Sequence, residues 1–170
     1  MAEERLQIKR FDPTFKNIVV KEKGGGNLFR CFACGTCSGG CPVAEFEPNF
    51  RPHEIMRLAI FGFKDELLSG NAIWLCTFCY ICYERCPRDV KPAMVIRALR
   101  NIAARQGYMP HGIKRVTDSV NKIGRTPDIT DFENEMRADA GLPPVASVDI
   151  QKMQKAFEKV KLEKFLPREH

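Results

Sequence analysis

Apolar residues return every three or four positions in several stretches of the chain, a spacing typical of helices that bury one face. The longest such stretch follows Asp89, a suitable N-cap, and ends at Gly107, a suitable stop. The pattern therefore predicts a long helix with one buried side over about residues 89–107. Its apolar stripe consists of Val95, Ile96, Leu99, Ile102 and Ala103, with Arg97, Arg100 and Arg105 on the opposite face.

Three further stretches predict helices with the same kind of stripe. The first covers residues 52–62 and begins with Pro52, which suits a first helical turn, and residues 64–68 offer one more turn. The second ends at Gly124, and the third follows Ser147. The apolar positions are Ile55, Leu58 and Ala59 in the first, Ile113, Val116, Val120 and Ile123 in the second, and Ile150, Met153, Phe157 and Val160 in the third.

Alternating apolar and polar positions, the pattern of a half-buried strand, are scarce in this sequence. The best strand candidate is 18–20, Ile-Val-Val, and it is short. We therefore predict a mostly α fold, in which a glycine run at 24–26 and GLPP at 141–144 separate the parts. These parts are an N-terminal arm (1–27), a core (28–107) and a helical C-terminal extension (108–170). The last helix of the extension either packs back on the core or docks on a partner.

All eight cysteines lie in two short runs that repeat each other. Residues 31–42 read CFACGTCSGGCP and residues 76–87 read CTFCYICYERCP, so every cysteine and the closing proline recur at an offset of 45. Each run has the spacing C-x2-C-x2-C-x3-C-P, the sequence form of a bacterial-type [4Fe–4S] site. Neither run lacks a cysteine, so two [4Fe–4S] clusters are the expected cofactors.

The spacing also predicts which cysteines share a cluster. The first three cysteines of a run can turn their thiolates toward one cube, whereas the fourth cannot reach the same cube comfortably. In two-cluster ferredoxins the fourth cysteine binds the other cluster, and the proline after it turns the chain away. We therefore expect one cluster on Cys31, Cys34, Cys37 and Cys86, and the other on Cys76, Cys79, Cys82 and Cys41.

Other uses of eight cysteines fit the sequence less well. Zinc sites pair two C-x2-C units, or one such unit with a histidine pair, about 12 to 20 residues apart, whereas these runs are compact and the three histidines have no ligand spacing. A disulfide framework needs an oxidising compartment, and the charged start MAEERLQIKR does not resemble a signal peptide. A thioredoxin-like dithiol needs a βαβ unit, which is not visible. We expect a cytoplasmic protein whose thiols bind metal.

One uncharged segment approaches the length of a membrane span. The 17 residues between Glu66 and Glu84 read LLSGNAIWLCTFCYICY, which is at the short limit for crossing a bilayer. Three closely spaced cysteines lie in it, and Ser, Gly and Asn interrupt its start. We interpret it as a buried cluster-binding segment and predict no membrane span.

Charge adds one further hypothesis. The formal net charge is +6, and two clusters at about −2 each would lower it to about +2. Residues 91–125 carry eight basic residues against one acidic residue, a net of +7, while the rest of the chain is at −1. This basic strip is either a docking face for an acidic partner or a set of solvated helix faces. No recognition fold or interleaved aromatics accompany it, so we expect no nucleic-acid binding.

Residues beside the two runs allow two interpretations each. Gly35, Gly39 and Gly40 either let the backbone approach a cluster and donate N–H groups to sulfur, or form a tight turn. Nearby aromatic rings either exclude water or belong to an ordinary core, and nearby arginines either offset cluster charge or are simply exposed. His53 is interpreted as a surface or capping residue. The aromatic residues are Phe32, Trp74, Phe78, Tyr80 and Tyr83, and the arginines are Arg30, Arg85 and Arg88.

Four protein thiolates on each cluster leave no open coordination position, so neither cluster can bind a substrate as a catalytic metal does. No G-x-G-x-x-G, P-loop or nucleophile arrangement accompanies the cysteines. We therefore expect no catalytic residue in this chain. It is predicted to relay single electrons between a donor and an acceptor in other subunits.

Three segments resemble a known family. FRCFACGTCSGGCPV, FGFKDELLSGNAIWLCTFCYICYERCPRDVKP and VIRALRNIAARQGYMPHGIKR are similar to the C subunit of heterodisulfide reductase, the small iron–sulfur protein found in methanogenic archaea and related anaerobes. The resemblance covers about residues 28–125 and is most specific in WLCTFCYICYERCPR. No ligand position departs from the family pattern.

The resemblance implies an α-helical ferredoxin domain at 28–107 with two [4Fe–4S] clusters. It implies that electrons come from the flavin-containing A subunit and pass to the catalytic B subunit, where the CoM-S-S-CoB heterodisulfide of methanogenesis is reduced. The upstream source in the cytoplasmic form would be a hydrogenase or formate dehydrogenase. Two alternatives stay open, a free diffusible ferredoxin and the iron–sulfur subunit of another oxidoreductase complex. The arm and tail, together about as long as the core, disfavour the free carrier.

Overall fold

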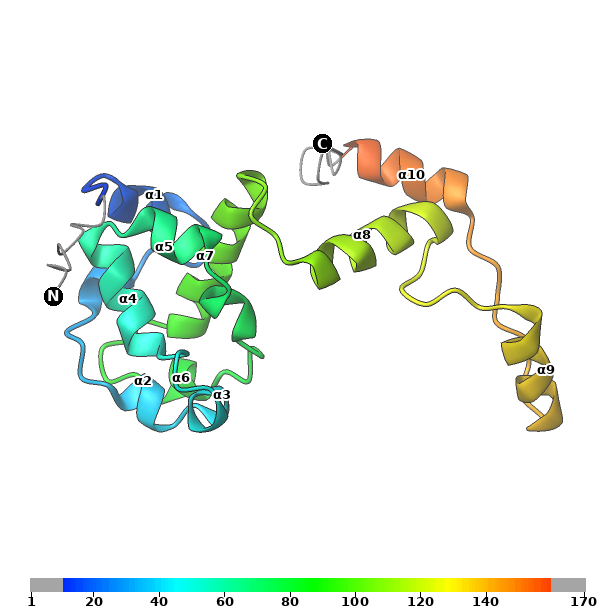
Figure 1. Cartoon of the computed structure of the whole chain (residues 1–170), viewed down its shortest axis with the longest axis horizontal. Coiled ribbons are helices and arrows are strands. Elements are labelled where there is room, and N and C mark those ends of the chain that lie inside the picture. The colour runs from blue at the N-terminus through cyan, green and yellow to red at the C-terminus, as the bar shows by residue number, and fades with distance from the viewer. Residues whose placement is uncertain (1–10, 160–170) are drawn as a thin grey trace, which may run out of the picture. The chain divides into compact units, whose positions relative to one another are not determined.

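A computed structural model describes residues 11–159, which form helices and, over that range, no strand. The mostly α prediction is therefore confirmed. The chain divides into two compact units, with the boundary between Tyr108 and Met109. Figure 1 shows the order of the helices along both units. No helix within the described range is long and apolar enough to cross a membrane.

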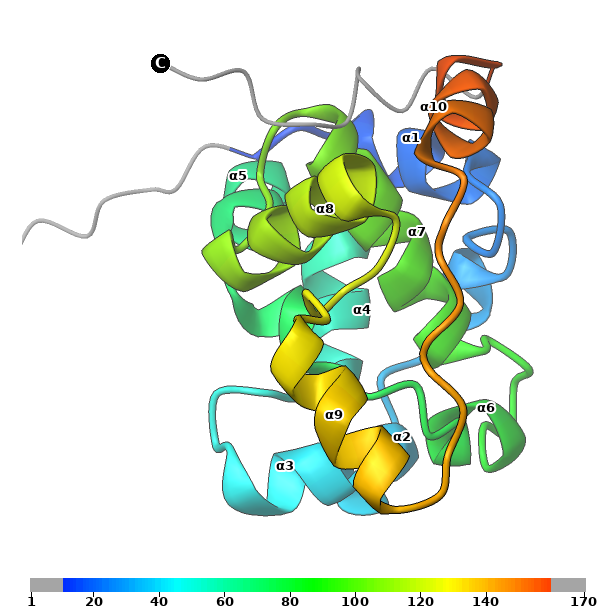
Figure 2. The same ribbon diagram turned by 90° about the vertical axis from the view of Figure 1, so that its right-hand side faces the viewer.

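The first unit is built from short helices and two 3-10 turns around one long helix. Its elements are α1 (Phe15–Lys21), η1 (Leu28–Arg30), α2 (Thr36–Gly39), α3 (Pro42–Phe46), α4 (Pro52–Phe61), α5 (Lys64–Ser69), η2 (Ala72–Leu75), α6 (Ile81–Glu84) and α7 (Pro92–Arg105). The two views agree that α2, α3 and α6 gather at the end of this unit opposite α1 and α5 (Figure 1, Figure 2). The short helices within the two cysteine runs, α2 and α6, thus lie together with α3, which follows the first run.

Helix α7 is the centre of the core of the first unit. Eight of its fourteen residues are buried, and the whole predicted stripe from Val95 to Ala103 is among them. Helices α1, α4, α5 and α6 all pack on it. The helix begins at Pro92 after Lys91, so the prediction that Asp89 is its N-cap is wrong. Asp89 and Lys91 instead adopt left-handed backbone (φ +52° and +59°), which turns the chain into the first helical residue.

The strand candidate at residues 18–20 is wrong, because these residues lie in α1. Phe15 and Val19 are both fully buried in the core, and they are four positions apart, so they lie on the same face of a helix. Three consecutive apolar residues favour a strand locally. The helix is stabilised instead, because the face that carries Phe15 and Val19 packs against α4 and α7.

The cysteine repeat is also a repeat of backbone structure. Helices α2 and α6 start and end at the same offset of 45 residues that relates the cysteines. The residue before each helix is left-handed, Gly35 with φ +79° and Tyr80 with φ +62°. Ala33 (φ +60°) and Phe78 (φ +54°), again 45 apart, are left-handed as well. Such alternating conformations turn successive N–H groups to one side of a loop, where they favour an anion.

The described part of the second unit, residues 109–159, contains three helices and buries little. They are α8 (His111–Ile123), α9 (Asp131–Asp139) and α10 (Ile150–Lys159), and none of the three has a buried residue. Helix α8 ends at Gly124 as predicted and contacts α10. In α10 the carboxylate of Asp149 accepts a hydrogen bond from the N–H of Lys152 (2.9 Å), so Asp149 caps this helix. The predicted stripe position Val160 lies outside the described residues.

Helix α9 was not predicted from the apolar pattern. Its signal is polar: the carboxylate of Glu133 accepts hydrogen bonds from the backbone N–H (2.7 Å) and the hydroxyl of Thr130. Ser or Thr followed three positions later by Glu is a capping box. The sequence T-D-F-E at 130–133 therefore contained the information, although the apolar periodicity did not.

Candidate metal centre

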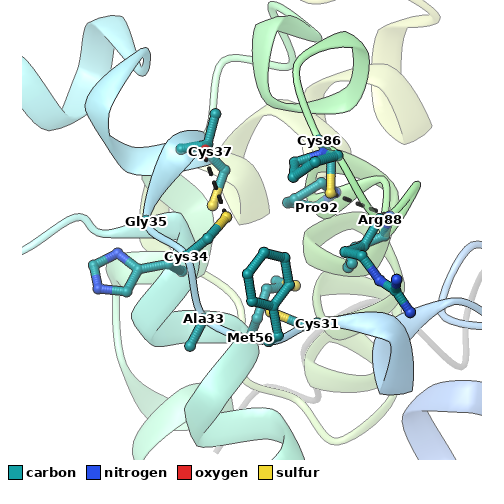
Figure 3. Close-up of a pocket in the computed structure, with 14 residues that line it drawn as sticks. Cys31, Ala33, Cys34, Gly35, Cys37, Met56, Cys86, Arg88 and Pro92 are labelled. Atoms are coloured by element: carbon teal, nitrogen blue, oxygen red, sulfur yellow. Dashed lines mark hydrogen bonds between the residues drawn. The ribbon is translucent and has the colours of Figure 1, made fainter.

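The first of two cysteine-lined pockets combines cysteines from both runs. Cys31, Cys34 and Cys37 of the first run and Cys86 of the second line it, and Figure 3 shows their sulfur atoms turned toward the shared space. The empty volume, including the open mouth, is about 330 Å³. Met56 of α4 contributes to the wall and is fully buried.

The second pocket has the reciprocal composition. Its cysteines are Cys76, Cys79, Cys82 and Cys41. The empty volume is about 320 Å³, nearly that of the first pocket, as expected of a duplicated site. The rest of the wall is largely apolar and includes Val43, Phe50, Ala93 and Ile96. All eight predicted ligand residues are thus gathered in two sets of four, in the combination that the spacing argument predicts.

The thiols inside the pockets are poorly suited to be charged without a cation. Burial, followed by the charges of Cys82 and neighbouring cysteines, raises the pKa of the Cys37 thiol to about 12. Burial also raises the pKa of Cys82 to about 11 and that of Cys76 above its ordinary value. The exposed Cys34 differs, because a hydrogen bond with the Thr36 hydroxyl (3.3 Å) lowers its pKa. Iron ions would supply the missing positive charge, since thiolate ligands become stable once a metal is bound.

Backbone N–H groups add to the fit. The N–H of Val90 donates to Cys86 Sγ at 3.3 Å. A hydrogen bond from the N–H of Phe78 opposes the rise in the pKa of Cys76. N–H donors to cluster sulfur are one of the ways in which proteins set a reduction potential. Over residues 11–159, no three His, Cys, Asp or Glu side chains meet at a point that could hold a single metal ion. The thiols instead surround two open volumes, an arrangement that fits a cluster of four irons.

The two sets of thiols lie close to each other. Helix α2, which contains Cys37, packs on α6, which contains Cys82 of the other run. The charge of Cys82 contributes to the raised pKa of Cys37, although these residues belong to different pockets. The side chain of Asn27 donates to the carbonyl oxygen of Asp89 (2.8 Å) and joins the start of the first run to the segment after the second. The two pockets are therefore parts of one unit.

Two of the aromatic residues beside the cysteine runs are largely exposed. Phe32 and Tyr80 are 62% and 42% exposed, so they do not belong to the core, but they line the first and the second pocket respectively, as the water-exclusion interpretation requires. The ring of Tyr80 contacts Phe78 and Tyr83, with centroid separations of 6.4 and 6.1 Å. These contacts stabilise the left-handed backbone that Tyr80 adopts in the place of a glycine.

His53 has a structural role beside the first pocket. Its ring Nδ1 and the hydroxyl of Ser38 form a hydrogen bond of 2.7 Å, and its backbone N–H donates to the same hydroxyl at 3.2 Å. The first turn of α4 is thereby attached to α2, and the hydroxyl of Ser38, not His53, satisfies an N–H of that turn.

The basic residues near the pockets differ in their surroundings. Arg30 forms an ion pair with Asp89 (3.6 Å) in which both side chains are 56% exposed, and Arg85 and Arg88 are exposed. Arg100, predicted on the solvent face of α7, is instead half-buried and donates hydrogen bonds to the segment that leads into Cys76. The predicted basic strip therefore does not form a uniform solvated face, and its residues are divided between the two units.

Comparison with known proteins identifies the family. The model of the 4Fe-4S dicluster domain matches residues 27–90. The chain is 42% identical over 146 residues to the C subunit of the H(2):CoB-CoM heterodisulfide,ferredoxin reductase of Methanothermobacter thermautotrophicus, covering 81% of this chain and 78% of the relative. It is 35% identical over 177 residues to an iron–sulfur C subunit of the CoB–CoM heterodisulfide reductase of Methanocaldococcus jannaschii (95% and 94%). It is 33% identical over 142 residues to the C subunit of the ferredoxin:CoB-CoM heterodisulfide reductase of Methanosarcina mazei (84% and 86%). Similarity of this extent, together with the dicluster match, shows that the chain belongs to the family of heterodisulfide reductase C subunits.

Proposed function

We propose that this chain relays electrons from the flavin-containing subunit to the catalytic subunit of a heterodisulfide reductase, where the CoM-S-S-CoB heterodisulfide is reduced. Membership of the C subunit family supports a role as iron–sulfur subunit in heterodisulfide reduction. The direction of the relay and its end points are our inference. They rest on the two cysteine pockets and on the family resemblance.

The observation that carries the proposal is the reciprocal composition of the two pockets. Each takes three cysteines from one run and the fourth from the other, so that neither site is complete without both halves of the repeat. A [4Fe–4S] cluster in each pocket would supply one-electron redox chemistry. The proposed ligands are Cys31, Cys34, Cys37 and Cys86 at the first site, and Cys76, Cys79, Cys82 and Cys41 at the second.

The residues around the thiols have defined tasks in such a relay. The apolar wall of the second pocket, with Phe50 and Ile96 buried, keeps water from the thiolates. The N–H of Val90 orients and stabilises the sulfur of Cys86. Contact between α2 and α6 keeps the two sites adjacent, which favours transfer between them. Since four thiolates fill every iron position, we assign no substrate site and no catalytic residue to this chain.

The electron source is proposed to lie upstream of the flavin-containing subunit. The relatives' names mention H2, formate or ferredoxin in different organisms, while the C subunit is common to all of them. A hydrogenase or formate dehydrogenase in the cytoplasm would therefore supply this complex through another subunit. This chain would itself meet only the flavin-containing and the catalytic subunits.

The test is an anaerobic electron-transfer assay with the chain carrying both clusters. The reduced chain is mixed in a stopped-flow instrument with the purified catalytic subunit and heterodisulfide, and reoxidation is followed by visible absorbance. We expect rapid reoxidation only when both are present, and none with heterodisulfide alone. Turnover of heterodisulfide by the chain alone would refute the assignment. So would failure to reduce a catalytic subunit that is active with an artificial reductant.

A further inference from the structure

Arg100 is attached to the segment that enters the second cysteine run. Its Nε donates to the carbonyl oxygen of Ile73 at 2.7 Å, and its Nη2 donates to the carbonyl oxygen of Cys76 at 2.6 Å. These acceptors lie 27 and 24 residues before it in the chain. One guanidinium therefore fixes η2 and the first ligand residue of the second site to the core helix α7.

The guanidinium is also enclosed by aromatic rings. Its central carbon lies 4.6 Å from the centroid of the Phe78 ring and 5.4 Å from that of Trp74. Both rings belong to the segment around Cys76, and both are partly buried. Contacts of this kind favour a cation that has lost part of its hydration. The geometry thus holds a positive charge beside the second site and limits its access to water.

This charge has no carboxylate partner among residues 11–159. None of the ion pairs in that range includes Arg100. Burial lowers the pKa of Arg100, and the thiolate of Cys76 opposes that change. An arginine remains protonated under these conditions. Its field therefore acts on the second site without being neutralised locally.

Within residues 11–159, the first site has no half-buried arginine that corresponds to Arg100. Helices α4 and α7 begin with Pro52 and Pro92, and each packs on the 3-10 turn that precedes a cysteine run, η1 and η2 respectively. Eight positions after its proline, α7 has Arg100, whereas α4 has the apolar Ile60. Arg88 lines the first pocket but is exposed, and the exposed Arg30 is paired with Asp89. The two sites, alike in their ligands, differ in the buried charge beside them.

We propose that Arg100 is a positioning residue that raises the reduction potential of the second site above that of the first, so that electrons enter at the Cys31 site and leave from the Cys76 site. Each added electron makes a thiolate-bound cluster more negative, and a nearby sequestered cation favours the reduced form. The Cys31 side would then face the flavin-containing subunit and the Cys76 side the catalytic one. This inference rests on the proposed function and adds which of the two sites faces each partner subunit.

The test compares three variants by EPR-monitored redox titration of the cluster-loaded chain. Arg100→Gln is expected to lower the higher of the two reduction potentials by about 59 mV, which is a tenfold change in the equilibrium constant of a one-electron couple. The lower potential is expected not to change. Arg100→Lys keeps the charge, and its equilibrium constant for reduction of the second site is expected to remain within about twofold of the native value. Arg57→Gln removes an exposed arginine of α4 and is expected to change neither potential.

Each other result overturns the inference. If Arg100→Gln lowers the lower potential instead, the charge acts on the other site. If it changes neither potential, the charge has no effect on either site. If Arg100→Gln does not retain iron, Arg100→Lys still decides, because a tenfold fall in the lysine variant would show that charge is not the cause. A native chain that transfers electrons to the catalytic subunit while Arg100→Gln leaves both potentials unchanged would refute this inference alone. A native chain that cannot transfer electrons would refute the proposed function.

Discussion

Gly35 is the position at which the backbone conformation of the first cysteine run can be tested most directly. It precedes α2 with φ +79°, and a Cβ built there meets no atom within 4 Å. Replacement by alanine therefore meets no protein atom, and the left-handed backbone costs roughly 1–2 kcal/mol. The reduced freedom of the unfolded chain offsets roughly 0.4–1 kcal/mol. We expect Gly35→Ala to lower the free energy of unfolding by about 1 kcal/mol.

Gly39 provides a matched control four residues later. It ends α2, does not have a positive φ, and a Cβ there also meets nothing within 4 Å. Gly39→Ala should therefore stabilise the chain by roughly 0.4–1 kcal/mol through the unfolded state. For a unit of this size a change of 1 kcal/mol moves the thermal midpoint by about 4–8 °C. The midpoint of the cluster-loaded protein, measured anaerobically by circular dichroism, should fall for Gly35→Ala and rise for Gly39→Ala.

Shifts of the same sign in the two variants would refute this reasoning, because a positive φ at Gly35 and its absence at Gly39 predict opposite signs. An unchanged midpoint for Gly35→Ala would mean that the loop before α2 does not hold the left-handed turn. Equal iron content in both proteins is the necessary control, since loss of a cluster would lower the midpoint for another reason.

Three further predictions concern the ligands, the core and the second unit. Cys41→Ser should give the same EPR spectrum and iron loss as Cys76→Ser, falling from about eight irons per chain toward about four, because both residues line the second pocket; a spectrum matching Cys31→Ser would contradict the crossed assignment. Leu99→Ala removes a side chain that is 0% exposed in α7 and should cost about 3 kcal/mol, seen as a lower denaturation midpoint; a loss below about 1 kcal/mol would show that α7 is not the centre of the core. Hydrogen bonds from Thr130 hold the pKa of Glu133 below its ordinary 4.5. The stability that these hydrogen bonds contribute to α9 is therefore fully present above pH 4.5 and is lost as the pH falls through the lowered pKa. Amide exchange across α9 should speed up over that interval beyond the intrinsic dependence on pH, and Glu133→Gln should abolish this extra change; an unchanged dependence in the glutamine variant would exclude the capping box as its cause.

The cysteine spacing was enough to predict the cofactor class and the composition of both pockets. A repeat at an offset of 45 that uses all eight cysteines allows few chemistries, and the crossing rule predicts which thiols lie together without knowledge of the fold. The helices α4, α7 and α8 were likewise visible from their apolar stripes, since a buried face imposes a period that survives in sequence. The side-chain pattern therefore contains this part of the structure.

Other features depended on contacts between distant residues. Residues 18–20 form a helix because Phe15 and Val19 are buried together against α4 and α7, which no local preference indicates. Tyr80 adopts the left-handed conformation that Gly35 adopts in the first run, because the loop around the second pocket has the same backbone structure. The rings of Phe78 and Tyr83 contact the Tyr80 ring.

Arg100 shows most clearly what sequence alone determined and what tertiary structure decided. By periodicity it belongs to the polar face of α7, and the sequence determined no more than that. The fold brings the carbonyl oxygens of Ile73 and Cys76 to it, so the guanidinium replaces water with protein acceptors and remains half-buried. Ligand chemistry follows from residue type and spacing along one chain. The electrostatic environment of each site depends on which groups the folded chain places around it, and only the tertiary structure contains that information.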